Sequence, residues 1–163
     1  VVNLFARSLG GFLGDRFGIN GGLKGRVRWL GLTLLGEGLT LMIFARMDTI
    51  LAIIVSLVIF SLFVQMAEGA TYSLLPFVDK KNLGSAMGIV GAGGNVGAVS
   101  ALFLFKQELT GLTWPSAFFV MGIAVALTSL LVPLIRFSAA AEHETKIEID
   151  VALAARRSLE LTT

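Results

Sequence analysis

Arg7 is the charged residue most suited to bind a ligand in a chain that is otherwise strongly apolar. It precedes Asp15 by eight residues, which corresponds to about 12 Å along a helix at 1.5 Å per residue. That distance reaches close to the middle of a hydrocarbon core about 30 Å thick. A permanently charged arginine at this depth is costly and indicates a functional site, and its planar fork of donors matches a planar oxyanion. Two other interpretations stay open: Arg7 could extend to the membrane surface, or form a structural ion pair with Glu68.

A second set of candidate binding residues lies in the apolar stretch from Gly84 to Phe105, which is unusually rich in glycine. Its glycines are Gly84, Gly88, Gly91, Gly93, Gly94 and Gly97. Small residues four positions apart are typical of closely packed transmembrane helices. The only strongly polar side chain in the run is Asn95, an amide that needs a partner at that depth. The run is either a tight helix–helix contact, with Asn95 bonding across it, or a helix that lines a substrate path.

The depths of these two groups coincide. A helix that begins at Gly84 carries Gly91 to about 10 Å and Asn95 to about 16 Å below its start. We therefore expect Arg7 and Asn95 to point into one interior space. We also expect the glycine-rich helix to make the shortest backbone approach to a neighbour.

Two carboxylates, Glu37 and Glu68, also fall within apolar stretches. A carboxylate at that depth is either paired or protonated, because an unpaired charge in the membrane is expensive. Glu68, close to Gly69 and Tyr72, is the candidate for proton coupling. A structural ion pair, or exposure of either Glu to a water-filled cavity, is the alternative.

The composition limits the class of protein. Hydrophobic residues make up 55% of the chain and charged residues 15%, with a mean hydropathy of +0.84. These values indicate an all-α polytopic membrane protein. The net charge of +2 is too small to favour nucleic-acid binding, and the absence of cysteine excludes a disulfide framework. With one histidine and no nucleophile–base pair or cofactor loop, the sequence predicts neither an enzyme nor a metal site or cofactor.

Hydrophobic runs predict four full spans and one partial span. The predicted segments are 1–14 (partial), 27–45, 50–78, 84–105 and 115–137, with a basic glycine-rich loop over 19–28 and a polar tail over 138–163. The first segment is too short to cross a bilayer, so we expect a truncated helix and a chain that is the C-terminal part of a larger protein.

Basic residues divide unequally between the two sets of connections. One set holds Arg16, Lys24, Arg26, Arg28, Lys80, Lys81 and Arg136, and the other holds Arg46 and Lys106. Because cytoplasmic loops carry the excess of Lys and Arg, the first set and the tail are predicted to be cytosolic.

Three motifs carry a resemblance to a known family. GFLGDRFG, from Gly11 to Gly18, resembles the G-x-L-x-D-R-x-G loop motif of the major facilitator superfamily. ARSLGG, from Ala6 to Gly11, and GAGGNVG, from Gly91 to Gly97, are similar to signatures of its nitrate/nitrite porter family, closest to the eukaryotic high-affinity type. The resemblance covers almost the whole apolar part of the chain and implies the end of helix 8 through helix 12 of the C-terminal helix bundle.

The resemblance implies a role for each motif. Arg7, Gly91, Gly93, Gly94 and Asn95 would bind nitrate or nitrite, and the loop motif of Gly11, Asp15, Arg16 and Gly18 would serve conformational change. In that motif Asp15 would cap a neighbouring helix and Arg16 would face cytosolic water.

For the whole protein, the resemblance implies proton-coupled nitrate uptake at the plasma membrane by alternating access. It also implies that matching elements lie in a missing N-terminal half. Some members of the family need a small single-span accessory protein as well. The resemblance also makes Glu37, on a peripheral helix, a weaker candidate for proton coupling than Glu68. A transporter of another small anion and a non-transporting nutrient sensor or scaffold are the alternatives.

Overall fold

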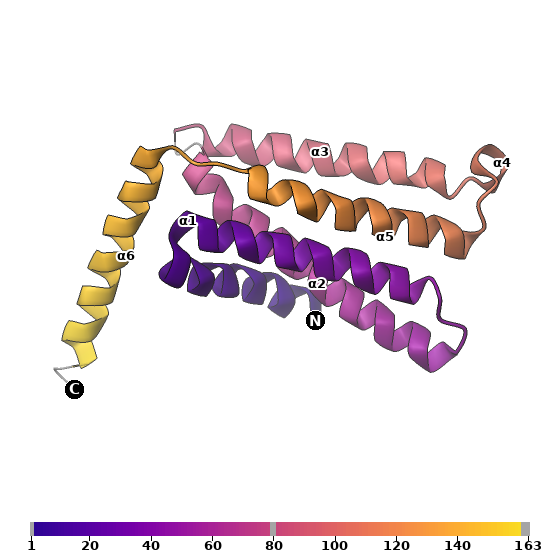
Figure 1. Ribbon diagram of the computed structural model, residues 1–163, viewed down its shortest axis with the longest axis horizontal. Helices are drawn as coiled ribbons and strands as arrows, with labels where there is room; N and C mark the ends of the chain where they lie inside the picture. The colour runs from indigo at the N-terminus through magenta and orange to yellow at the C-terminus, as the bar shows by residue number, and fades with distance from the viewer. Residues whose placement is uncertain (1, 79–80, 161–163) are drawn as a thin grey trace.

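The computed structural model describes residues 2–78 and 81–160, and within these ranges it contains helices and no strand. The elements are α1 (Val2–Phe44), α2 (Ile50–Val78), α3 (Leu83–Leu104), α4 (Gln107–Thr110), α5 (Trp114–Leu131), the short 3-10 helix η1 (Val132–Leu134) and α6 (Ala139–Glu160). Figure 1 shows α1, α2, α3 and α5 running roughly alongside one another, with α6 crossing their direction at one end.

The longest helix, α1, consists of two arms that fold back on each other. The break is at Gly22, whose φ of 60° and ψ of −149° are available almost only to glycine. Gly25 then lies so close to Phe17 that a Cβ atom would overlap its carbonyl. The sequence predicts a loop over 19–28, and this prediction is wrong, because one glycine is enough to reverse the chain while both sides stay helical (Figure 1).

In the part of the chain that the structure describes, four helical stretches are long and apolar enough to cross a membrane: Phe5–Phe44, which includes both arms of α1, Ile50–Val78, Leu83–Leu104 and Trp114–Leu134. Large apolar side chains project from them into the surroundings, among them Leu51, Ile89 and Leu130. An outward apolar surface of this extent suits lipid rather than water.

Glycines set the distances between the packed helices. In the second arm of α1, a Cβ atom on Gly38 would lie 2.7 Å from the carbonyl oxygen of Gly122 in α5, and one on Gly122 would lie 2.8 Å from the Gly38 oxygen. Closer to the break, a buried apolar cluster joins α1, α2 and η1 through Val27, Leu30, Ala70, Leu74 and Val132. Backbone contact and one small core therefore hold this bundle together.

The contact between α1 and α5 yields a stability prediction. Gly38→Ala forces the two backbones apart and should cost about 1–3 kcal/mol by overpacking. Gly21→Ala is the matched control, because Gly21 is in α1, has no atom of a neighbour within 4 Å and does not have a positive φ. Thermal denaturation of the purified full-length protein measures the difference. Equal midpoints for the two variants would show that this contact is not tight.

Candidate functional site

Arg7 forms an ion pair with Glu68 across the contact between α1 and α2. Its Nη2 atom lies 3.1 Å from the Oε1 atom of Glu68. The two side chains remain 48% and 38% exposed, so the pair is open on one side. The ion pair is one of the alternatives left open by the sequence, and its open side leaves room for a further group to approach the guanidinium.

Tyr72 supports the same guanidinium from a second direction. The Cζ atom of Arg7 lies 4.9 Å from the centre of the Tyr72 ring, within the range of a cation–π interaction. Glu68 and Tyr72 are four residues apart and therefore lie on one face of α2. This face gives Arg7 one partner for its charge and one for its flat surface.

Small residues bring the first arm of α1 against α2. A Cβ atom on Gly69 would overlap the carbonyl oxygen of Arg7, and one on Gly10 would overlap the backbone of Met66. The Trp29 indole on the second arm donates a hydrogen bond of 2.9 Å to the Gly10 carbonyl. The sequence does not predict that Gly10 and Gly69 support Arg7 in this way, since nothing in their spacing shows that Gly10 meets Met66 and Gly69 meets Arg7.

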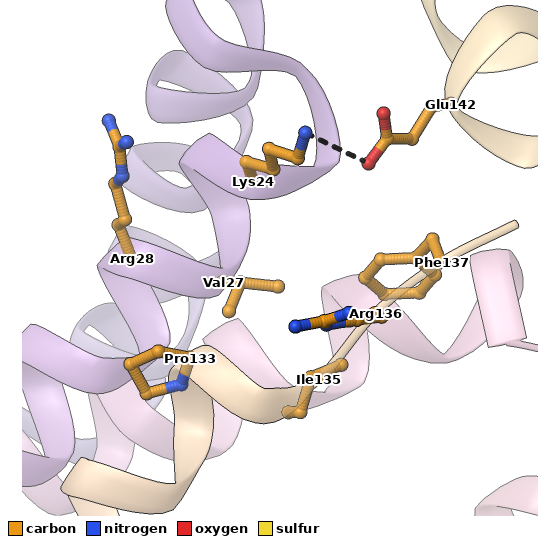
Figure 2. Close-up of a pocket in the computed structure, with 8 residues that line it drawn as sticks. All are labelled: Lys24, Val27, Arg28, Pro133, Ile135, Arg136, Phe137 and Glu142. Carbon is orange, nitrogen blue, oxygen red and sulfur yellow. Dashed lines mark ion pairs between the residues drawn. The ribbon is translucent and has the colours of Figure 1, made fainter. Parts of the chain in front are cut away.

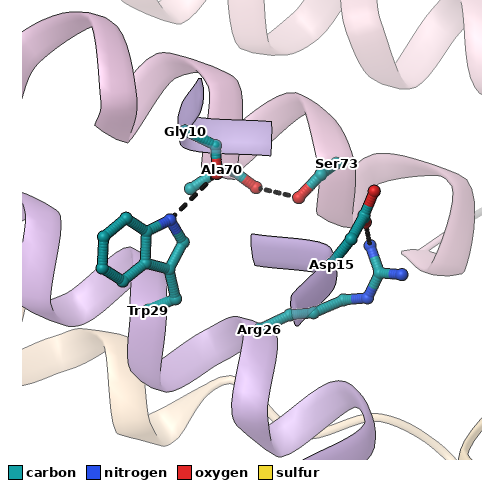
Figure 3. A network of polar contacts seen from close by, with 6 residues as sticks. All are labelled: Gly10, Asp15, Arg26, Trp29, Ala70 and Ser73. Carbon is teal, nitrogen blue, oxygen red and sulfur yellow. Dashed lines mark hydrogen bonds and ion pairs between the residues drawn. The ribbon is translucent and has the colours of Figure 1, made fainter. Parts of the chain in front are cut away.

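The loop motif forms a clasp between the two arms of α1. Asp15 accepts a hydrogen bond of 2.5 Å from Nη1 of Arg26, whose side chain is only 13% exposed and lies over the ring of Phe77 (Figure 3). The Nε atom of Arg26 is buried and lacks a hydrogen-bond partner within the described residues. The sequence predicts that Asp15 caps a neighbouring helix, and the structure corrects this, because the reversal at Gly22 brings Arg26 within reach first.

The remaining motif residues differ in their surroundings. Gly18 lies directly against the Arg26 side chain, where a Cβ atom would come within 2.7 Å of Nε. Gly11 faces the Gly69 carbonyl, with 3.9 Å from its added Cβ atom to that oxygen. Arg16 is exposed. The motif thus combines a tight contact of Gly18 with Arg26, an ordinary contact of Gly11 with α2, and an ion pair whose Asp15 side is exposed.

The glycine-rich helix α3 has no close neighbour along its length. None of its residues is buried, and a Cβ atom on Gly91, Gly93 or Gly94 would meet nothing within 4 Å. The expectation that this helix makes the shortest backbone approach is wrong for the described chain, where the tightest approaches lie between the two arms of α1, at Gly25, and between α1 and its neighbours α2 and α5. Glycine spacing predicts a surface for close approach, but it does not say which segment approaches.

Arg7 and Asn95 are not brought together in the described chain. Asn95 is exposed on α3, which makes its main contacts with α2 and α4, and no hydrogen bond joins it to Arg7. Figure 1 shows α3 along one side of the bundle and the first arm of α1 along the other. The expectation of one shared interior space is therefore not met within this segment, because depth fixes the height of a residue along the bundle and not its direction around it.

Metal binding finds no support in the described residues, where no three His, Asp or Glu side chains gather closely enough to hold an ion. The arrangement at Arg7 offers instead a fixed cationic fork, a competing carboxylate and an aromatic face. These groups can bind and release a small anion without covalent chemistry.

Together, the membrane-length helices and the charged cluster between two of them define a polytopic all-α membrane protein. The sequence profile described as Major Facilitator Superfamily matches residues 1–160. The chain belongs to this superfamily, and the all-α polytopic fold predicted from its composition is confirmed.

Similar proteins of known name are transporters. The chain is 37% identical over 134 residues to Nitrate transporter 2.2 of Chlamydomonas reinhardtii, covering 78% of this chain and 26% of that protein. It is 32% identical over 137 residues to High affinity nitrate transporter 2.5 of Arabidopsis thaliana, covering 84% and 27%. A third relative, Nitrate/nitrite transporter NrtP of Nostoc punctiforme, is 31% identical over 134 residues, covering 80% and 25%. The predicted resemblance to nitrate/nitrite porters is confirmed by these relatives.

The chain spans about a quarter of the length of these relatives. No solved structure matches it.

Proposed function

We propose that this chain is part of a transporter that carries nitrate or nitrite across a membrane. The observation that carries the proposal is the half-exposed cluster of Arg7, Glu68 and Tyr72 between the first arm of α1 and α2. The names of the similar proteins supply the substrate. A planar anion presents two oxygens to the guanidinium fork in one plane, which a point charge cannot reproduce.

In this mechanism Glu68 competes with the substrate for Arg7. While Glu68 is ionised, it neutralises the guanidinium at 3.1 Å. A proton that arrives on a carboxylate oxygen of Glu68 removes that competition, so Arg7 becomes free to bind an anion. Release of the proton on the other side of the membrane restores the ion pair and expels the anion. Proton and anion then move together in the same direction.

The glycines of α3 would line the path of the anion at a separate place. Gly91, Gly93 and Gly94 leave bare backbone on a helix with open space beside it, and Asn95 adds an exposed amide. This supports a surface that is completed by parts of the transporter outside the segment. We propose that the anion meets Arg7 and α3 from a space enclosed by both halves.

Alternating access requires that helices move as rigid pieces about the central site. The two arms of α1, joined at Gly22 and clasped by Asp15 and Arg26, are suited to move as one such piece. We assign the end that carries this clasp to the cytosol, together with α6, because basic residues gather there. We propose that the transporter works in the plasma membrane as an uptake system, where the apolar outer surface of its helices would accept a small single-span partner.

Arg7→Lys in the full-length transporter should abolish most nitrate uptake while surface expression stays normal. Lysine keeps the charge but loses the planar fork. Arg46→Lys is the matched control, because Arg46 also lies over an aromatic ring, at 4.5 Å from Phe119, and is far from the cluster in sequence. Uptake per unit of surface protein is the measurement. Near-normal uptake by Arg7→Lys would limit Arg7 to an electrostatic or structural role.

Glu68→Gln should separate anion binding from proton movement. The amide cannot take up a proton, so nitrate should still bind, while nitrate-induced proton entry and the pH dependence of uptake should be lost. Glu37→Gln is the control, since Glu37 is a partly buried carboxylate on the second arm of α1. Intracellular pH recorded during nitrate addition distinguishes the two variants. Intact proton entry in Glu68→Gln would remove Glu68 from the coupling mechanism.

Alanine at Gly91, Gly93 or Gly94 tests the proposed path. If these glycines line it, at least one variant should reach the membrane at normal level with sharply reduced uptake, and a larger side chain at that position should be worse. If they serve only packing against another part of the transporter, uptake should fall in step with protein level. Uptake normalised to surface protein, measured for each variant, decides between these outcomes.

A further inference from the structure

A second basic site lies far from Arg7, at the end of the bundle where α6 begins. A cavity of about 490 Å³ opens there between the second arm of α1, the segment after η1 and α6. Lys24 and Arg28 from α1 and Arg136 from the segment after η1 supply three cations to its lining. Figure 2 shows the Arg136 guanidinium reaching toward α1 below Val27.

Among the side chains that the structure describes, one of the three cations, Lys24, has an acidic partner. The Nζ atom of Lys24 lies 3.6 Å from Oε1 of Glu142 at the start of α6, as Figure 2 also shows. Arg28 and Arg136 form no ion pair with any residue whose side chain the structure describes. Arg28 also lines the cavity, but Figure 2 shows its guanidinium extending away from Lys24 and Glu142, so it adds positive charge at the rim. The cavity therefore combines one neutralised cation with the Arg136 guanidinium, which can still bind an anion, and a second guanidinium at its rim.

The same cavity has an apolar wall. Val27, Pro133, Ile135 and Phe137 line it beside the basic residues. Val27 belongs to the buried cluster of the bundle, against which Phe137 packs, whereas Ile135 is 43% exposed. The last membrane-length helix ends at Leu134, so this wall stands where a hydrocarbon core gives way to head groups. A ligand that suits the cavity has an anionic head and an apolar body.

We propose that this cavity binds the phosphate of an anionic phospholipid. Guanidinium groups bind phosphate oxygens in pairs, and basic pockets between helices at the membrane surface recognise such head groups. Ile135 and the outward apolar surface of α5 then lie along the acyl chains. Free inorganic phosphate shares the charge chemistry but gains nothing from the apolar wall, which favours the lipid. The proposal is independent of nitrate transport, since no residue of the Arg7 cluster takes part.

The ion pair between Lys24 and Glu142 gives the site an internal competitor. The Glu142 carboxylate occupies one of the three cations and joins α6 to α1. Removing that carboxylate frees Lys24 for the phosphate, so the lipid should bind more tightly. A damaged fold would lower lipid retention, whereas loss of the Glu142 carboxylate should raise it.

The test uses the full-length protein purified in neutral detergent, with lipid retention measured by native mass spectrometry. Phosphatidylglycerol should be retained in preference to phosphatidylcholine. The double variant Arg28→Gln/Arg136→Gln should weaken retention of phosphatidylglycerol by about tenfold or more, because it removes the charged hydrogen-bond donors of both guanidinium groups. Arg46→Gln is the control, because Arg46 lies in the connection at the other end of the α1 second arm, and it should leave retention unchanged.

Two further measurements identify the source of the phosphate and separate loss of the site from misfolding. Inorganic phosphate at millimolar concentration should fail to displace phosphatidylglycerol; displacement would assign the site to a soluble phosphate and overturn the lipid proposal. Glu142→Gln should increase retention. Unchanged retention in both the double variant and Glu142→Gln would equally overturn the proposal.

Discussion

The backbone contact between the first arm of α1 and α2 is the constraint on which the charged site depends. Gly10 and Gly69 remove the side chains that would hold the two helices apart. Their absence lets an arginine on one helix reach a carboxylate and an aromatic ring on the other. An arginine is tolerated within a span only when such partners satisfy it. The glycines therefore act on the chemistry indirectly, by setting the distance between the helices. The positions of Arg7, Glu68 and Tyr72 relative to one another depend on how rigid this contact is.

The sequence was a good guide to class and a partial guide to geometry. Apolar runs predict a polytopic all-α protein, and this fold is confirmed by the superfamily match and the helices themselves. The reversal at Gly22 was missed because a helix break needs only one residue, whereas a basic glycine-rich stretch suggests a loop. Arg7 and Glu68 were both identified, and their pairing was among the alternatives considered, because each charge needs a partner at that depth.

The direction of a residue around the bundle could not be derived in the same way. Counting residues gives the height of Arg7 and Asn95, but which way each points depends on helix rotation and on neighbours. The glycines of α3 face open space in the described chain, so no neighbour there fixes the direction in which Asn95 points. Similarly, the partner of Asp15 depended on where the chain turns, and that turn was not predicted.

The reversal at Gly22 also bears on how the protein is built into a membrane. The contacts that close the two arms, between Asp15 and Arg26 and between Gly10 and Trp29, join residues no more than nineteen positions apart. Stacking of Phe17 on Trp29 adds a third contact of the same kind. Such local contacts cost little chain entropy to form and need no later helix. The two arms can thus enter the bilayer as one preformed hairpin whose backbone hydrogen bonds are already made. The surface against which α2 packs then exists before α2 arrives.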